Sequence, residues 1–247
     1  MRARKAEQLE AVRGVDLEVC DGETVALVGQ SGSGKSTLAR LMLGLEMPDS
    51  GSVLWRGREI SSLDRASTLA FRREVQVVFQ DPYGSLNPRQ TVGSALREAI
   101  GVHRLASGAA ADRKARDLLS LVGLPAAATM RYPQEFSGGQ RQRIAIARAL
   151  AVEPRMILAD EPVSSLDLSV QAQILNLLLD LRERFDMALL LITHDLSVVK
   201  HLSERVAVMH EGRIVERGPT SVVLDMPEHP ATRALIACAL PLRRRFP

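Results

Sequence analysis

The sequence predicts an α/β fold in which a parallel sheet carries a phosphate-binding loop, and three observations lead to this prediction. The first is the stretch from Gly29 to Ser36, GQSGSGKS, which fits the pattern of Gly, four residues, Gly, Lys and Ser or Thr. The second is its setting, because residues 24–28 suit a buried parallel strand and residues 37–43 suit a helix. The third is that other short apolar runs also end in polar residues, as strands of open α/β sheets do beside their ligand.

The residues of this loop suit the phosphates of a nucleotide. Gly32 and Gly34 let the backbone turn its N–H groups toward phosphate oxygens, and the helix that follows directs its positive end at the same anion. Lys35 adds a charge for the β- and γ-phosphates, and the Ser36 hydroxyl is placed to hold Mg²⁺. The alternative is a Gly/Ser-rich turn that fits by chance, and the flanking strand and helix argue against it. We therefore expect nucleotide contacts from Gly29, Gln30, Ser31, Gly32, Ser33, Gly34, Lys35, Ser36 and Thr37.

Length and composition narrow the class of protein. The chain has 247 residues, and its 32 basic and 29 acidic residues leave a net charge of +3, too small an excess to argue for nucleic acid. Cys20 and Cys238 are far apart and in no metal-ligand spacing, so we expect ordinary reduced thiols. Apolar runs such as 188–192 are far too short for a membrane span, and no secretory signal is visible. We expect a soluble intracellular protein whose membrane role would be carried by a partner.

The rest of the chain predicts strands and helices around the loop. Residues 9–19 alternate as a strand does, and residues 53–58 predict a hairpin, the small antiparallel β region. From about 81 to 133 the pattern is helical and contains no strand signal, so we expect a helical subdomain inserted between core segments 9–80 and 134–218. A C-terminal extension covers 219–247, and one domain spans 1–241. Further strands are predicted at 75–79, 156–159 and 188–193, a second hairpin at 206–216, and helices from 137, at 168–185, from 197 and at 231–239.

Polar side chains follow three of these strands. Asp160 and Glu161 end the segment MILADE, where Asp160 could reach Mg²⁺ and Glu161 could deprotonate an attacking water; an acidic loop is the alternative. His194 follows strand 188–193 and could bond the γ-phosphate, although a lone His at a strand end is more often a plain core or surface residue. Gln80, at another strand end, could sense magnesium or water. Because these strands should share one sheet, we expect the four side chains at one edge.

The helix from Ser137 begins with SGGQ, which allows two interpretations. Ser137 and Gln140 have the spacing of a capping box, so a capped helix with a glycine-rich entry is one of them. The other is an anion site, because two glycines leave the backbone open and the helix dipole favours a phosphate. The second interpretation adds four candidates that contact phosphate: Ser137, Gly138, Gly139 and Gln140.

Together these motifs resemble the ATP-binding subunits of ABC transporters. In that family GQSGSGKS is the Walker A loop, Gln80 the Q-loop glutamine, and FSGGQ the signature motif, with Phe136 where Leu is usual. MILADE is the Walker B segment, residues 164–167 are the D-loop ending at Asp167, and His194 is the switch histidine. The resemblance implies an ABC-type P-loop NTPase that hydrolyses ATP with Mg²⁺. It assigns catalysis to Lys35, Glu161 and His194. It assigns magnesium binding to Ser36, Gln80 and Asp160. Nucleotide contacts come from the loop and also from Gln80, the SGGQ residues and Asp167.

The resemblance also implies partners. In such a family the phosphate loop of one subunit faces SGGQ of a second, identical or paralogous subunit, with two ATP molecules between them. Polytopic membrane permease subunits and a periplasmic or extracellular substrate-binding protein would complete an importer at the cytoplasmic face of the bacterial cell membrane. Residues 79–92 and 226–241 are similar to the dipeptide, oligopeptide and nickel importer group, and residues 81–88 are expected to touch a permease.

Several alternatives stay open. Features of the chain lean toward both peptide and nickel members of the group and do not decide the transported substrate; we expect uptake of dipeptides or oligopeptides, with nickel import as the alternative. A soluble ABC ATPase outside transport is less favoured, because the chain has one domain and no long coiled-coil insertion. A non-hydrolysing binding module is disfavoured by the presence of Glu161 and His194.

The N-terminus departs from the family. Members usually begin with an extra edge strand and an aromatic residue that stacks on adenine, whereas the first aromatic here is Trp55. Residues 10–23 resemble what normally follows that aromatic. We therefore expect that the chain as given starts late, through a wrongly chosen start codon rather than a truncation, and that an aromatic residue is encoded in frame upstream.

Overall fold

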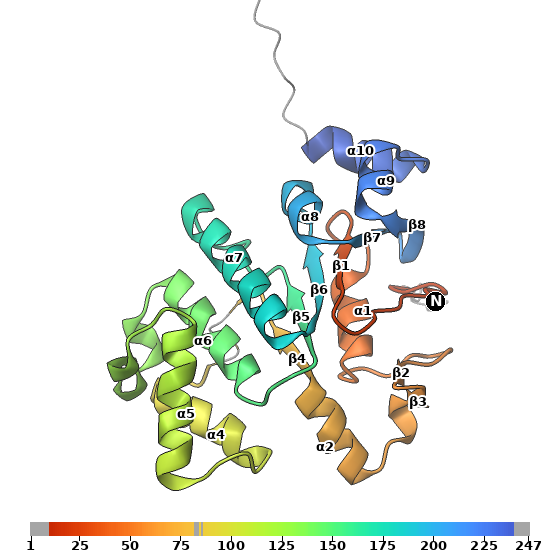
Figure 1. The fold of residues 1–247 in the computed structure, drawn as a ribbon. Helices are drawn as coiled ribbons and strands as arrows, with labels where there is room; N and C mark the ends of the chain where they lie inside the picture. The colour runs from red at the N-terminus through yellow and green to blue at the C-terminus, as the bar shows by residue number, and fades with distance from the viewer. Residues whose placement is uncertain (1–9, 82–83, 85, 240–247) are drawn as a thin grey trace, which may run out of the picture.

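The computed structural model describes residues 10–81, 84 and 86–239 and has the predicted α/β fold (Figure 1). One sheet has the strand order β4-β5-β6-β1-β7-β8, and every neighbouring pair is parallel except β7 with β8. The chain therefore brings the carboxyl ends of the parallel strands to one edge of the sheet. The strands are β1 (Thr24–Val28), β4 (Val75–Val78), β5 (Met156–Asp160), β6 (Ala188–Thr193), β7 (Arg205–His210) and β8 (Arg213–Pro219).

Helices cover both faces of the sheet, because its strands are apolar on both sides. Helix α1 (Lys35–Met42) packs on the face that carries Leu27, Leu158 and Ile192. The opposite face is covered by five helices, so the molecule has three layers with the sheet in the middle. Those helices are α6 (Gly138–Leu150), α7 (Leu168–Phe185), α8 (Leu196–Leu202), α9 (Thr220–Asp225) and α10 (Pro230–Ala239).

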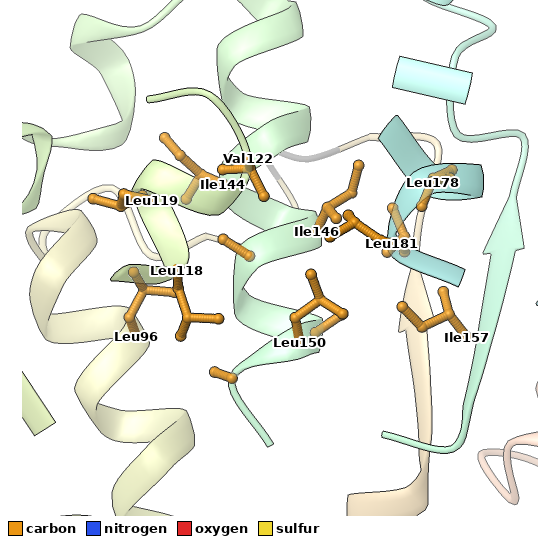
Figure 2. Packing of buried hydrophobic residues seen from close by; sticks show 14 of the residues in the cluster. Leu96, Leu118, Leu119, Val122, Ile144, Ile146, Leu150, Ile157, Leu178 and Leu181 are labelled. Atoms are coloured by element: carbon orange, nitrogen blue, oxygen red, sulfur yellow. The ribbon is translucent and has the colours of Figure 1, made fainter. Parts of the chain in front are cut away.

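The predicted helical stretch forms a further group of helices beside α6. Helices α4 (Val92–Val102) and α5 (Gly108–Leu121) are followed by short 3₁₀ turns at Ala126–Met130 and Pro133–Glu135. Figure 2 shows Leu96 of α4, Leu119 of α5 and Ile144 of α6 in one apolar cluster. Helix α6 lies between the sheet and the pair formed by α4 and α5. The described residues between β4 and β5 contain helices and no strand, as the pattern predicts.

The prediction of a strand over residues 9–19 is wrong for its described part. Residues 10–23 form no strand, although Val15, Leu17 and Val19 are half-buried and pack against the α1 face of the core. The alternation therefore reports one-sided burial. A strand also needs a ladder of backbone bonds to a neighbour, and here the contacts are isolated, as in the bond from the Arg13 N–H to the Gly212 carbonyl (2.7 Å).

The predicted small hairpin is present as β2 (Leu54–Trp55) and β3 (Arg58–Glu59). It leads through a 3₁₀ turn (Ile60–Ser62) to helix α2 (Arg65–Glu74), which the sequence pattern does not predict because Phe71 is its one fully buried residue. The Trp55 ring packs edge-on against Phe71 with centroids 5.9 Å apart, and its Nε1–H donates to Glu74 (3.2 Å). The first aromatic of the chain is therefore anchored on α2.

Among the described residues, no helix combines the length and the apolar character that crossing a membrane requires.

Candidate nucleotide-binding site

The polar residues that follow the strands gather at the carboxyl edge of the parallel sheet. Register pairs Val28 of β1 with Thr193 of β6, and Asp160 of β5 with Ile192 of β6, so these strands end at one level. The loop from Gly29 follows β1, and His194 follows β6 directly. The structure therefore brings the sequence-predicted loop, carboxylates and histidine together, as expected for an open α/β sheet.

The loop after β1 is closed over itself by Lys35. This side chain is only 6% exposed, and its Nζ donates to the carbonyls of Gly29 (2.8 Å) and Gln30 (2.9 Å). The loop turns through Gly32 and Gly34, whose φ angles of 79° and 106° lie in the region that glycine favours. Helix α1 begins without a side-chain cap, so its first N–H groups are free to meet a ligand.

Two buried polar groups show that the loop fits a polar ligand. Burial lowers the pKa of Lys35, while the carboxylates of Glu161 and Asp160 act in the opposite direction. Ser33 is 5% exposed, and its hydroxyl has no hydrogen-bond partner within the described part of the chain. A buried polar group without a partner costs about 1–3 kcal/mol. An anion with several acceptor oxygens would give the Ser33 hydroxyl a partner and would give Lys35 a charged acceptor in place of two neutral carbonyls.

Asp160 and Ser36 form the oxygen pair expected of a magnesium site. The Ser36 hydroxyl hydrogen-bonds to the Asp160 carboxylate, and Asp160 is half-buried. Burial raises the pKa of Asp160, and the Ser36 hydrogen bond only partly offsets this. Such donors suit Mg²⁺, which often takes one or two protein oxygens and completes its shell with phosphate and water. Among the described residues, no group of three or more His, Cys, Asp or Glu side chains is arranged to hold a metal ion by itself. Gln80, exposed just beyond β4, is the third predicted magnesium residue.

Glu161 and His194 meet at this edge. His194 Nδ1 lies 3.2 Å from Glu161 Oε1, and the Glu161 side chain is 22% exposed, so water can reach it. The φ angle of Glu161 is +45°, uncommon for a residue other than glycine, and its N–H donates to the carbonyl of Ile192 (2.8 Å). The Ser164 hydroxyl donates to the Glu161 carbonyl (3.2 Å). Residues in this sparsely populated region of backbone conformation are concentrated at active sites, so the geometry of Glu161 supports a functional role.

The capping box predicted at SGGQ is present at the start of α6. The Gln140 N–H donates to Ser137 Oγ (3.4 Å), and the Ser137 N–H donates to Gln140 Oε1 (3.0 Å). Both side chains are nevertheless exposed, so the motif remains open to a second molecule.

The two glycines of SGGQ lie against the start of α7 and the residues before it, and this packing leaves no room for a side chain at Gly139. A Cβ atom at Gly139 would lie inside 3.0 Å of Cγ1 of Val170, a separation that real Cβ atoms essentially never show. At Gly138 it would lie 3.1 Å from the Leu166 side chain. Asp167 between them caps α7, accepting from the Val170 N–H (3.1 Å). Hydrogen bonds from Ser169 and Val170 lower the pKa of Asp167.

The comparison with protein families decides the family. Residues 12–164, more than half of the chain, match the family model described as ABC transporter. The chain belongs to the ABC transporter family. Curated relatives include the glutathione import ATP-binding protein GsiA of Salmonella paratyphi A, 50% identical over 234 residues, which are 95% of this chain and 38% of the relative. GsiA of Escherichia coli K12 is 49% identical over 245 residues, 98% of this chain and 39% of the relative. The chain thus spans about two fifths of these relatives.

Solved ABC proteins share the fold along nearly the whole chain. The ATP-binding cassette MJ0796, captured as a dimer in a post-hydrolysis state bound to ADP and Pi, is 30% identical with a TM-score of 0.74, covering 88% of this chain and 94% of that one. The protein cbiO1 of Clostridium perfringens, part of the ABC transporter complex cbiONQ, is 26% identical with a TM-score of 0.75, covering 93% and 92%. The fold is therefore that of the ABC ATPase cassettes, which confirms the resemblance of the motifs.

Some ABC-cassette residues near the site were not found from the sequence. Gln142 of α6 is buried and donates to the carbonyl of Phe79, next to Gln80, which ties the SGGQ helix to the end of β4 (3.3 Å). Met209 and Gly212 of the β7–β8 hairpin contact the phosphate loop. The sequence does predict this hairpin from its Glu-Gly turn, but nothing in the pattern says what the turn touches.

Proposed function

We propose that this chain is the ATP-hydrolysing subunit of an ABC importer. The observation that carries the proposal is the Glu161–His194 pair at the edge of the sheet that also holds the Lys35 loop and Asp160. These are the parts that phosphoryl transfer to water requires, namely a phosphate cradle, a metal ligand and a base. A structural neighbour bound to ADP and Pi and relatives named as import ATP-binding proteins support it.

The phosphates of ATP would lie in the loop 29–37. Lys35, which now donates to the carbonyls of Gly29 and Gln30, exchanges these neutral acceptors for charged phosphate oxygens, a stronger kind of hydrogen bond. Ser36 and Asp160 would hold Mg²⁺, with Gln80 as a further ligand. When bound, the metal neutralises charge that develops on the phosphate oxygens.

Glu161 would take the proton of the attacking water. Its carboxylate is partly exposed and is oriented by His194 Nδ1. Because Nδ1 of His194 contacts the carboxylate, its Nε2 stays available to face the γ-phosphate. The bonds of the Glu161 backbone to Ile192 and Ser164 hold this residue at its positive φ, and His194 would hold the carboxylate in place before the substrate arrives.

The substitution Glu161→Gln tests the base. It keeps the size of the side chain but removes the basic oxygen, so turnover should fall about 100- to 10,000-fold while ATP binding is retained. Phosphate release and equilibrium ATP binding are measured in parallel. Glu98→Gln, on the exposed surface of α4, serves as the control and should leave both unchanged. Unchanged turnover in Glu161→Gln would sink the assignment.

SGGQ would complete the ATP site of a second subunit, identical or paralogous. Ser137 and Gln140 are exposed at a helix N-terminus, where the dipole favours an anion. Ser137→Arg should abolish hydrolysis and leave nucleotide binding to the isolated monomer nearly intact, whereas Ser120→Arg, exposed in α5, should change neither. A loss of monomer binding as large as that of Lys35→Ala would contradict the shared site.

The importer assignment includes partners and a substrate class. We propose a single domain over 1–241 with an inserted helical subdomain at 81–133, at the cytoplasmic face of the cell membrane. Its residues 81–88 would touch a polytopic permease, although Pro82, Tyr83 and Ser85 lie outside the described residues. A periplasmic or extracellular binding protein would deliver a short peptide, because the relatives are named for import of glutathione, itself a short peptide.

Uptake in cells distinguishes the substrate classes. Deleting the gene should abolish uptake of a labelled short peptide and leave nickel uptake unchanged. Loss of nickel uptake alone would instead support the nickel-import alternative. If neither changes, the soluble ABC ATPase becomes the better assignment.

A further inference from the structure

The tip of the β7–β8 hairpin lies against the phosphate loop. The turn is made by Glu211 and Gly212, with φ angles of 46° and 80°, as in a two-residue hairpin turn. The Gly212 N–H donates to the carbonyl of Ser33 in the loop (3.0 Å), and the Gly212 carbonyl accepts from the Arg13 N–H (2.7 Å). One residue, Gly212, therefore joins the phosphate loop to the segment before β1 through its N–H and its carbonyl.

Met209 contacts the loop from the same hairpin. A Cβ atom at Gly29 would lie inside 3.0 Å of the Met209 carbonyl oxygen, and one at Gly34 would lie 2.8 Å from the Met209 Cε. Gly34 also approaches the carbonyl of Ala11 too closely for a side chain. Met209 itself is 1% exposed, and an irregularity of register separates it from Val208. Such irregularities re-aim the residues beside them.

These contacts add support from outside the loop to the internal hydrogen bonds of Lys35 with the Gly29 and Gln30 carbonyls. The loop is rich in glycine, the helix that follows has no side-chain cap, and the Ser33 hydroxyl has no partner within the described part of the chain. A flexible loop would have to become ordered when a phosphate binds, which reduces affinity. Support from the hairpin keeps the N–H donors of the loop in place before the ligand arrives.

We propose that Met209 and Gly212 are positioning residues that fix the shape of the phosphate loop and thereby set the affinity for ATP. The inference rests on the proposed nucleotide binding by this loop and adds which residues outside it control that binding. Neither residue needs to touch the nucleotide, because Met209 acts through Gly29 and Gly34, and Gly212 acts through Ser33.

The first test compares Gly212→Ala with Gly57→Ala. Both glycines are the second residue of a hairpin turn and have a positive φ, 80° at Gly212 and 72° at Gly57. An alanine would therefore suffer similar backbone strain at either position. A Cβ atom at Gly212 would lie 3.0 Å from the Ala11 carbonyl and 3.2 Å from Arg13, whereas Gly57 has nothing within 4 Å. We expect the dissociation constant for MgATP to rise at least about fivefold in Gly212→Ala and to stay unchanged in Gly57→Ala.

The second test separates positioning from general destabilisation. Met209→Ala and Met187→Ala both remove a fully buried methionine, but Met187 lies just before β6, at the end of the sheet away from the loop. Both variants should lower the unfolding temperature, and only Met209→Ala should raise the dissociation constant for MgATP. Met209→Leu keeps the volume and should restore binding to nearly the wild-type value.

The outcomes are distinguishable. If the wild-type chain does not bind MgATP, the proposed function fails and the inference fails with it. If the wild type binds MgATP and both Gly212→Ala and Met209→Ala bind it as tightly as the wild type does, the proposed function stands and the positioning role is refuted. The positioning role is also refuted if Met187→Ala weakens binding as much as Met209→Ala, because the effect would then follow stability alone.

Discussion

Gly139→Ala tests why the signature motif contains a second glycine. Gly139 is buried in the first turn of α6, and a Cβ atom there would overlap Cγ1 of Val170 at the start of α7. Valine is branched at Cβ and stiff, so the overlap can be relieved only by a shift of one helix. At Gly138 the neighbour is a terminal methyl of Leu166, 3.1 Å away, which can rotate aside.

The size of the effect follows from these contacts. Overpacking a close contact costs about 1–3 kcal/mol, while alanine in place of glycine gains up to about 1 kcal/mol in a helix. The net loss then lies between about 0 and 3 kcal/mol. We expect a value near the middle, about 1–2 kcal/mol, which lowers the unfolding temperature of a chain of this size by about 2–8 °C. Gly138→Ala should stay within about 2 °C of the wild type, because its helix gain offsets a mild contact.

The assay is thermal unfolding of Gly138→Ala, Gly139→Ala, Val170→Ala and the double variant that combines Gly139→Ala with Val170→Ala. Removing the γ-carbons of Val170 makes room for the new methyl group, so the two changes should be coupled by about 1–2 kcal/mol. Equal stability of the two glycine variants, or strictly additive effects in the double variant, would refute the packing explanation. Turnover of the double variant then shows whether Gly139 is also needed for phosphate contact.

Two further predictions concern regions outside the site. Burial raises the pKa of Glu216, but hydrogen bonds such as those from the N–H groups of Glu228 (2.9 Å) and His229 (3.0 Å) outweigh it and lower the pKa. A lowered folded-state pKa gives stability that is present above the ordinary glutamate value of about 4.3 and is lost as pH falls through the folded value. Glu216→Gln should therefore be less stable at pH 7 and lose less stability when the pH falls below 4. Urea unfolding at pH 7 and at pH 3 tests this, and an equal loss of stability in the two proteins would contradict it. Trp55→Phe should change the dissociation constant for MgATP by less than about twofold, because the Trp55 ring packs on α2. A rise of about tenfold, measured by equilibrium binding, would show instead that this aromatic residue reaches the nucleotide.

The sequence by itself determined the elements whose signals are local. The phosphate loop, the capping box of Ser137 and Gln140 and the alternating or helical periodicities each depend on a few neighbouring residues. Backbone geometry, capping and one-sided burial act over that range, so a short stretch is enough to specify them. The ordered set of motifs also identified the family, which the match to residues 12–164 confirms.

The tertiary structure decided which of these elements meet. Glu161 and His194 are 33 residues apart and come within 3.2 Å only because β5 and β6 are neighbours in one register. The close approach of Gly139 to Val170 depends on how two helices pack on the same face of the sheet. Such contacts follow from strand order and helix packing, to which distant parts of the chain contribute equally.

In the segment 10–23, the sequence pattern predicts burial correctly but does not predict strand pairing. Its alternation correctly marks which side chains face the core, as Val15, Leu17 and Val19 do. It does not make a strand, because a strand exists only with a paired neighbour, and the contacts of this segment with the β7–β8 hairpin are isolated bonds. The residues of the segment determine which of its sides is buried, whereas pairing depends on two segments and is fixed only when the whole chain has folded.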